Sequence, residues 1–119
     1  MAQHNEFGKK GEQMAVAFLE KNGYTILKRN YRFQKAEIDI IAIKNAVLSI
    51  VEVKSRSNTM IINPKDAITP KKIKLLTLAA NEYVIKNELD VEVRFDIISV
   101  IKEKGRYAIE HIENAFYHF

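Results

Sequence analysis

The hydrophobic pattern of the chain predicts two helices and five strands. Between residues 7 and 22, apolar residues recur with the period of an α-helix on one broad face, and Gly23 follows as a typical helix-ending residue. A second helix begins at the capping pair Thr69-Pro70 and runs to about residue 87. Strands are predicted for residues 24–31, 37–43, 47–54, 91–101 and 107–112. The element order is therefore α-β-β-β-α-β-β.

The second and third predicted strands form the centre of the sheet. Both are apolar on both faces, which is typical of strands covered on each side. The three residues 44–46 between them are short enough for a hairpin. Residues 55–69 are polar and irregular, with Asn63-Pro64 as a breaker, so we expect a mobile loop there.

Length and composition indicate one globular domain covering residues 1–119. The chain is 47% hydrophobic and 29% charged, which excludes disordered and fibrous classes. No apolar run approaches the ~20 residues that span a bilayer. The polar N-terminus lacks the apolar stretch of a signal peptide, so we expect a cytoplasmic protein.

The numbers of cysteines and histidines limit which metal ions the chain could bind. The absence of cysteine excludes disulfides, thiolate catalysis and cysteine-ligated zinc or iron–sulfur sites. The three histidines lie near the termini without zinc-binding spacing. Any metal should therefore be hard and oxygen-ligated, meaning Mg²⁺ or Mn²⁺. A net charge of +4 is compatible with a polyanionic partner.

Three charged residues lie in the two apolar central strands: Asp39, Glu52 and Lys54. Burying them costs several kcal/mol unless they pair or bind a cation. Glu52 and Lys54 point to the same face, and the short connection puts Asp39 roughly opposite Glu52. This pattern predicts a divalent-metal site for phosphodiester hydrolysis. A surface Glu–Lys ion pair on a solvated strand is the alternative interpretation.

Each residue of this group has an expected role. Asp39 and Glu52 would hold the metal, with the carbonyl oxygen of Val53 as a further ligand. Lys54 would position the attacking water or neutralise charge in the transition state. Glu12 lies within the apolar face of the first helix, so it either reaches water at the edge of that face or supplies another metal ligand.

Five blocks in order carry a resemblance that spans residues 7–116. They resemble the signatures of the small bacterial YraN-like proteins, which are placed among the restriction-endonuclease-like PD-(D/E)xK nucleases and are similar to archaeal-type Holliday-junction resolvases. The blocks are Gly8-x-x-Gly11-Glu12, Lys28-Arg29-Asn30-Tyr31, Glu37-Ile38-Asp39-Ile40-Ile41, Val51-Glu52-Val53-Lys54-Ser55-Arg56 and Arg94-Phe95-Asp96-Ile97.

The resemblance implies a restriction-endonuclease-like α/β fold with a central mixed sheet of about five strands flanked by helices. It places Glu12, Asp39, Glu52 and Lys54 on the nuclease family's first-helix acid, two metal acids and catalytic lysine, respectively. Two positions depart from the family pattern: Ala36 replaces the usual glycine before Glu-Ile-Asp, and Asp39 follows isoleucine rather than proline.

Several residues near this group have two interpretations. Ser55 and Arg56 could contact a phosphate or be solvated in a loop. The resemblance makes Lys72 a phosphate or active-site contact, whereas its stem could simply cover apolar surface. Glu37 could be an extra ligand or an exposed strand end. Arg94 and Asp96 could pair with each other. Four aromatic residues could stack on unpaired bases, or pack in the core or at its edge: Tyr31, Phe33, Phe116 and Tyr117.

The leading interpretation is a Mg²⁺- or Mn²⁺-dependent endonuclease acting on branched or structured DNA. A homodimer is expected if four-way junctions are the substrate, because they require two cuts. A non-catalytic nucleic-acid binding or adaptor module on the same fold is the alternative. A weaker option is a protein-interaction subunit that uses the 55–69 loop or the aromatic tail.

Overall fold

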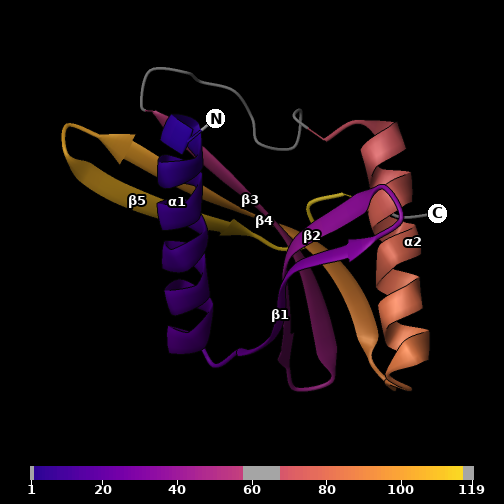
Figure 1. The fold of residues 1–119 in the computed structure, drawn as a ribbon. Helices are drawn as coiled ribbons and strands as arrows, with labels where there is room; N and C mark the ends of the chain where they lie inside the picture. The colour runs from indigo at the N-terminus through magenta and orange to yellow at the C-terminus, as the bar shows by residue number, and fades with distance from the viewer. Residues whose placement is uncertain (1, 58–67, 117–119) are drawn as a thin grey trace.

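The structure is a computed structural model that describes residues 2–57 and 68–116, with the backbone alone for residues 2–5 and 57. One sheet of five strands lies between two helices (Figure 1). The elements are α1 (Ala2–Lys21), β1 (Thr25–Phe33), β2 (Ala36–Lys44), β3 (Val47–Ser57), α2 (Pro70–Lys86), β4 (Glu92–Glu103) and β5 (Arg106–Ile112).

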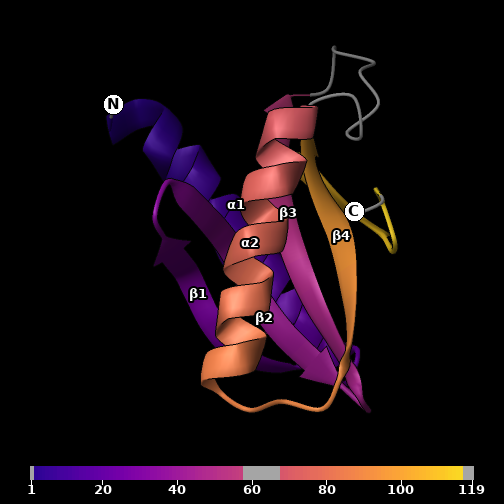
Figure 2. The same cartoon turned by 90° about the vertical axis from the view of Figure 1, so that its right-hand side faces the viewer.

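The strands follow one another across the sheet in chain order. β3 and β4 run parallel and the other neighbouring pairs are antiparallel. A parallel pair needs a crossover, and α2 supplies it between β3 and β4. Figure 2 shows α1 and α2 on opposite faces of the sheet. The predicted α/β class, mixed sheet and element order are therefore confirmed.

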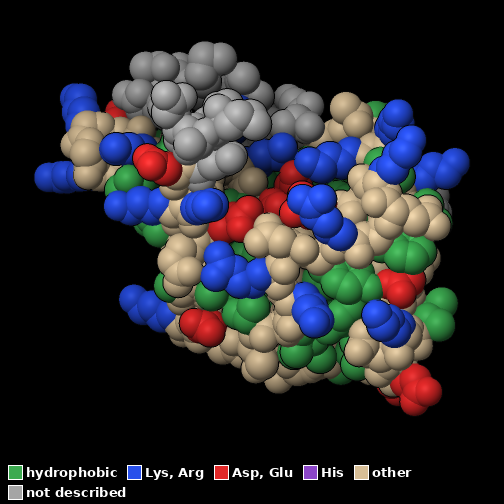
Figure 3. All heavy atoms as spheres, in the orientation of Figure 1, with side chains coloured by type: hydrophobic (Ala, Val, Ile, Leu, Met, Phe, Trp, Pro, Cys, Tyr) green, Lys and Arg blue, Asp and Glu red, His purple; other side chains and the backbone are tan. Residues whose placement is uncertain are grey.

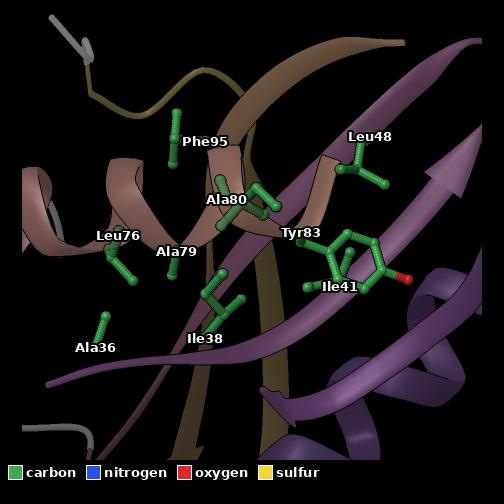
Figure 4. Packing of buried hydrophobic residues seen from close by; sticks show 10 residues of the cluster. Ala36, Ile38, Ile41, Leu48, Leu76, Ala79, Ala80, Tyr83 and Phe95 are labelled. Atoms are coloured by element: carbon green, nitrogen blue, oxygen red, sulfur yellow. The ribbon is translucent and has the colours of Figure 1, made fainter. Parts of the chain in front are cut away.

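Two apolar layers hold the helices to the sheet. On one face, α2 packs its buried side chains against the central strands, as Figure 4 shows. On the other face, Ala15, Val16 and Leu19 of α1 pack against β2, β3 and β4. The α2 layer includes Leu76, Ala79, Ala80 and Tyr83 of the helix with Ile38, Ile41, Leu48 and Phe95 of the sheet.

The element bounds differ from the predicted ones mainly in α1, which begins at Ala2 instead of residue 7, and in β3. This strand continues to Ser57, because it pairs in parallel with β4 through Ser57↔Lys102. The first residues of the predicted 55–69 loop therefore belong to the sheet, and residues 58–67 lie outside the described residues. No helix in the described part has the length and hydrophobicity that a membrane crossing requires.

Three of the aromatic residues that could stack on bases are described by the structure, and they are partly buried side chains that pack against the core. Tyr31 contacts Tyr83 edge to face, with ring centroids 5.1 Å apart. Phe33 and Phe116 pack against the α2 layer, and Phe116 lies 5.4 Å from the Phe95 ring. Tyr117 lies outside the described residues. Core packing therefore explains Tyr31, Phe33 and Phe116.

Candidate active site

The candidate site forms where the ladder between β2 and β3 ends. The antiparallel pairs run from the hairpin turn to Ile40↔Val51, and Asp39 and Glu52 are the next residues along the two strands. Beyond this point the Oδ2 atom of Asp39 accepts a hydrogen bond of 2.8 Å from the Val53 backbone N–H. The side chain of Asp39 thus satisfies a backbone donor, which fixes the carboxylate beside Glu52.

The electrostatic surroundings of Asp39 are unfavourable for a carboxylate. Burial, and then the negative charge of Glu52, raise the pKa of Asp39 to about 7. The hydrogen bond from Val53 lowers this pKa, whereas the charge of Glu12 raises it further. Carboxylates from β2, β3 and α1 therefore act on one another at one place in the fold.

Glu52 is buried, with 6% of its surface exposed. Its Oε2 atom pairs with the Lys72 ammonium of α2, and the Lys54 Nζ atom lies 3.5 Å from the same oxygen. Two ammonium groups therefore compensate one buried carboxylate, which makes the burial of its charge tolerable. The predicted proximity of Glu52 and Lys54 is present, and the solvated-strand alternative does not describe Glu52.

Glu12 is half-buried and faces the same group of charges from α1. Burial raises the pKa of Glu12, the Arg29 guanidinium lowers it, and the charges of Glu37 and Glu52 raise it. The side chain therefore lies within electrostatic range of the acids rather than pointing away from them.

Gly11 explains how α1 comes so close to β3. Gly11 is buried, and a side chain there would collide with the Ser55 hydroxyl and lie 3.3 Å from the Ser55 Cβ atom. The missing side chain lets the helix backbone approach the strand. The next residue in the helix, Glu12, is thereby brought close to Asp39 and Glu52, and these three carboxylates form the acidic group of the site. Ser55 lies against α1 at this contact.

The acidic group meets part of the requirement for a hard metal ion. Mg²⁺ prefers oxygen ligands, is bound by one or two carboxylates and retains several waters. Asp39 and Glu52 provide such a pair from adjacent strands. Within residues 2–57 and 68–116, however, no three acidic or histidine side chains form a cluster that could hold a metal ion. The donor set thus fits a two-carboxylate site and, in this arrangement, not one completed by Glu12.

Basic side chains surround the acidic group at the surface. Figure 3 shows acidic side chains gathered between α1 and α2, with Lys and Arg side chains on several sides of them. A pocket of about 240 Å³ opens beside the group, between the start of β2 and the first turn of α2. Its charged lining consists of Lys35, Glu37, Lys71 and Lys72.

The structure places the other candidate residues in different settings. Arg56 has a buried Nε atom without a hydrogen-bond partner in the described part of the chain. Lys72, given by the resemblance as a phosphate or active-site contact, pairs with Glu52, a partner that the sequence analysis did not name. Glu37 is largely exposed and its carboxylate lies 3.6 Å from the Arg32 Nε atom. Ala36 keeps an ordinary strand backbone, so its position does not require glycine.

One sequence signal could have revealed the partner of Glu52. The first turn of α2 carries Lys71 and Lys72 and no acidic residue. Lysine is unfavourable at a helix N-terminus, where the helix dipole is positive. Such a pattern indicates that an anion from elsewhere in the fold lies near this turn.

A second polar group lies around Asp96, which is fully buried. Arg94 pairs with it as one interpretation proposed, with Nη2 2.8 Å from Oδ2. Its oxygens also accept hydrogen bonds from the Ser49 hydroxyl and the Asn114 backbone N–H, and lie 2.9 Å from the His111 Nε2 atom. Burial works against ionisation, but these hydrogen bonds hold the pKa of Asp96 below its usual value.

Comparison with known proteins matches this chain to one family, by a sequence model of the family and by individual relatives. Residues 11–100 match the sequence model of a family described as "Uncharacterised protein family UPF0102". A UPF0102 protein of Flavobacterium psychrophilum is 59% identical over 119 residues, covering all of both chains. Relatives in Christiangramia forsetii and Bacteroides thetaiotaomicron are 55% and 52% identical, the first over all of both chains and the second over 98% of this chain and 97% of its own.

Proposed function

This chain belongs to the uncharacterised protein family UPF0102, and we propose that it is a divalent-metal-dependent endonuclease that hydrolyses phosphodiester bonds in branched or structured DNA. One observation carries the proposal. The Asp39 carboxylate is fixed beside the buried Glu52 carboxylate at the end of a strand ladder, with lysine ammonium groups next to them. Clustered acids of this kind repel phosphate, which argues against a purely structural or binding role.

Asp39 and Glu52 are the residues that would hold Mg²⁺ or Mn²⁺, with the Val53 carbonyl as a candidate further ligand. Glu12 would join them as a ligand only after its side chain moved toward the ion, because the described residues do not form a three-acid cluster in this arrangement. When bound, such an ion supplies charge neutralisation at the phosphoryl oxygens and activation of a water. The raised pKa of Asp39 supports this assignment, because it reflects burial and then the negative charge of Glu52, and a bound cation would offset both.

Lys54 is the residue that would act on the substrate directly. Its ammonium lies 3.5 Å from Glu52, and 21% of its side chain is exposed, so it can reach a phosphate above the site. There it would donate hydrogen bonds to a phosphoryl oxygen or to the attacking water. Arg56 follows two residues later on β3, and its guanidinium group is a candidate donor to a neighbouring phosphate.

Charge favours a polyanionic partner, the class to which DNA belongs. The chain carries a net charge of +4 although its acids include the candidate metal ligands. The lysines and arginines around the acidic group in Figure 3 are suited to neutralise backbone phosphates on either side of the reacting one. Branched DNA is proposed because of the resemblance to junction resolvases. Cutting a four-way junction twice would require a two-fold dimer, which places two sites on one junction.

A cleavage assay tests the proposal. Four-way junction, flap, single-stranded and linear duplex substrates with one shared labelled strand are incubated with the protein and Mg²⁺ or Mn²⁺. We expect cleavage by the wild-type chain and its loss, by at least about a hundredfold, in Glu52→Gln and Asp39→Ala. Glu20→Gln, which changes an exposed acid of α1, is the matched control and should cleave normally.

Two outcomes would contradict parts of the proposal. Cleavage of every substrate at the same rate in wild type and Glu52→Gln would point to a contaminating nuclease and defeat the catalytic assignment. A protein that sediments as a monomer at tens of micromolar, with and without junction DNA, would defeat the dimer.

A non-catalytic nucleic-acid binding module is the second candidate, and one observation favours it. Lysines already compensate Glu52, and no three-ligand metal cluster is present among the described residues. In that case DNA binding measured by fluorescence anisotropy should be tight and indifferent to Mn²⁺. The endonuclease proposal predicts instead that calorimetry detects Mn²⁺ binding that depends on Asp39 and Glu52.

A further inference from the structure

Lys72 has an unusual position for a residue of α2, because its ammonium pairs with the buried Glu52 carboxylate of β3. We propose that Lys72 is a displaceable counter-ion: it holds Glu52 in the metal-free protein, competes with the metal for it, and is released toward substrate phosphate when the metal binds. This inference rests on the proposed metal site and assigns a regulatory contact within it.

The geometry allows Lys72 to leave without disturbing the fold. Its backbone N–H is held at 3.1 Å by the Thr69 hydroxyl, which caps α2, so the first turn of the helix stays in place. Its side chain is 39% exposed, whereas that of Glu52 is 7% exposed. A pocket of about 240 Å³ beside the acidic group is lined in part by Lys72, so there is open space next to this side chain for the released ammonium.

The two lysines on Glu52 differ in this respect. Lys54 lies on the same strand as Glu52, two residues away, and its side chain is 21% exposed. Lys72 comes from another element, α2, and its side chain is the more exposed of the two, at 39%. Lys72 is therefore the partner that a competing cation can displace, and Lys54 is the partner that stays near the reacting group.

Electrostatics favours release once a dication is present. A dication and the Lys72 ammonium cannot share one Glu52 oxygen without strong repulsion. The first turn of α2 contains Lys71 and Lys72 without any acidic residue of its own, and Lys72 pairs with Glu52. When the metal takes Glu52, Lys72 loses this partner, and the positive helix end beside the site becomes more favourable for an incoming phosphate.

Calorimetric titration with Mn²⁺ in the absence of DNA tests this proposal. Lys72→Met removes the competing charge but keeps the apolar stem, and we expect it to bind Mn²⁺ roughly tenfold more tightly than wild type. Lys71→Met, the exposed neighbour in the same turn, is the matched control and should keep wild-type affinity. Lys72→Arg, which retains a cation, should bind Mn²⁺ no more tightly than wild type.

Thermal unfolding provides a second readout that a purely structural role would not reproduce. Without metal, Lys72→Met should melt at a lower temperature than Lys71→Met, because Glu52 loses its nearest partner. With saturating Mn²⁺, the increase in melting temperature should be larger for Lys72→Met than for wild type. If Lys72→Met does not fold, Lys72→Gln serves for the same comparison.

Each result decides between the two proposals. Equal or weaker Mn²⁺ binding by Lys72→Met would overturn the counter-ion assignment and leave the endonuclease proposal standing. Tighter binding by Lys72→Met without DNA cleavage by any variant would support the counter-ion and overturn the endonuclease. An absence of Mn²⁺ binding in both wild type and Lys72→Met would overturn both.

Discussion

At the scale of single residues, Asp39 shows a conflict between stability and the proposed activity. Its half-buried carboxylate lies next to Glu52, and loss of hydration together with the charge of Glu52 raises its pKa to about 7. An acid whose pKa is raised on folding destabilises the folded state when it ionises. Natural proteins retain such costs where function needs them, so a substitution that removes the charge should stabilise the metal-free protein.

Asp39→Asn is expected to stabilise the metal-free protein at pH 8 by roughly 1–3 kcal/mol, since one pKa unit corresponds to ~1.4 kcal/mol. Asparagine retains an oxygen that can accept the hydrogen bond from the Val53 N–H. The folded pKa lies above the usual value of 3.8, so the penalty grows from about pH 4 to pH 7 and is then constant. Urea unfolding at pH 4 and pH 8 measures the effect.

The matched control for this prediction is Asp90→Asn, at an exposed position outside the sheet. It should leave the stability difference between pH 4 and pH 8 unchanged. If Asp39→Asn destabilised the protein equally at both pH values, the carboxylate would have a net structural role instead of an electrostatic cost.

At the scale of elements, the contact between α1 and β3 positions Glu12. Glycine within a helix normally costs nearly 1 kcal/mol relative to alanine. Gly11 is nevertheless needed, because β3 lies so close that a side chain would meet Ser55. Gly8 differs, since a side chain there would have no neighbour within 4 Å. Substitution by alanine is therefore expected to change the stability of the protein in opposite directions at these two glycines of α1.

Gly11→Ala should destabilise the protein by roughly 1–2 kcal/mol, because the new methyl group overpacks the contact with Ser55. Gly8→Ala should stabilise it by up to ~1 kcal/mol through helix propensity alone. Urea unfolding of both variants gives the comparison. Combining Gly11→Ala with Ser55→Gly should recover most of the loss, and failure to recover would show that Ser55 is not the obstacle.

At the scale of the whole molecule, the Asp96 group joins segments that are distant in sequence. Asp96 of β4 accepts from Ser49 of β3 and from Asn114 after β5, and it lies next to His111 of β5. Arg94, which pairs with it, also donates a 2.6 Å hydrogen bond to the Tyr24 hydroxyl between α1 and β1. One buried carboxylate thus organises the face of the sheet that α1 covers.

Asp96→Asn should destabilise the protein by about 3–5 kcal/mol at pH 7, because Arg94 is left without its buried partner. The folded pKa of Asp96 lies below the usual 3.8, so its stabilisation is present above that value and is lost as the pH falls through the folded pKa. The difference between wild type and variant should accordingly shrink below about pH 4.

Chemical denaturation across pH 2.5 to 7 measures this dependence. Glu113→Gln is the matched control: Glu113 also lies near Arg94, at 3.7 Å, but 58% of its side chain is exposed. Its effect should stay below about 1 kcal/mol at every pH. A stability difference for Asp96→Asn that did not change with pH would mean that packing, not charge, explains the loss.

Much of the fold was predictable because local rules determine it. Alternation and turn length placed β2 and β3 in a hairpin, and this register brought Asp39 next to Glu52. Thr69 and Pro70 marked the start of α2, where the structure has the cap. The pairing of Arg94 with Asp96 followed from their spacing on one strand. These features depend on residues that are close together in the chain.

The tertiary structure alone decided three other features. The parallel pairing with β4 extended β3 to Ser57, the approach of α1 placed Ser55 against Gly11, and α2 brought Lys72 to Glu52. Each depends on how two elements pack, and side-chain contacts across that distance leave no periodic pattern in the sequence. The sequence by itself therefore determined the elements and which acids would meet, whereas packing determined which cation compensates them.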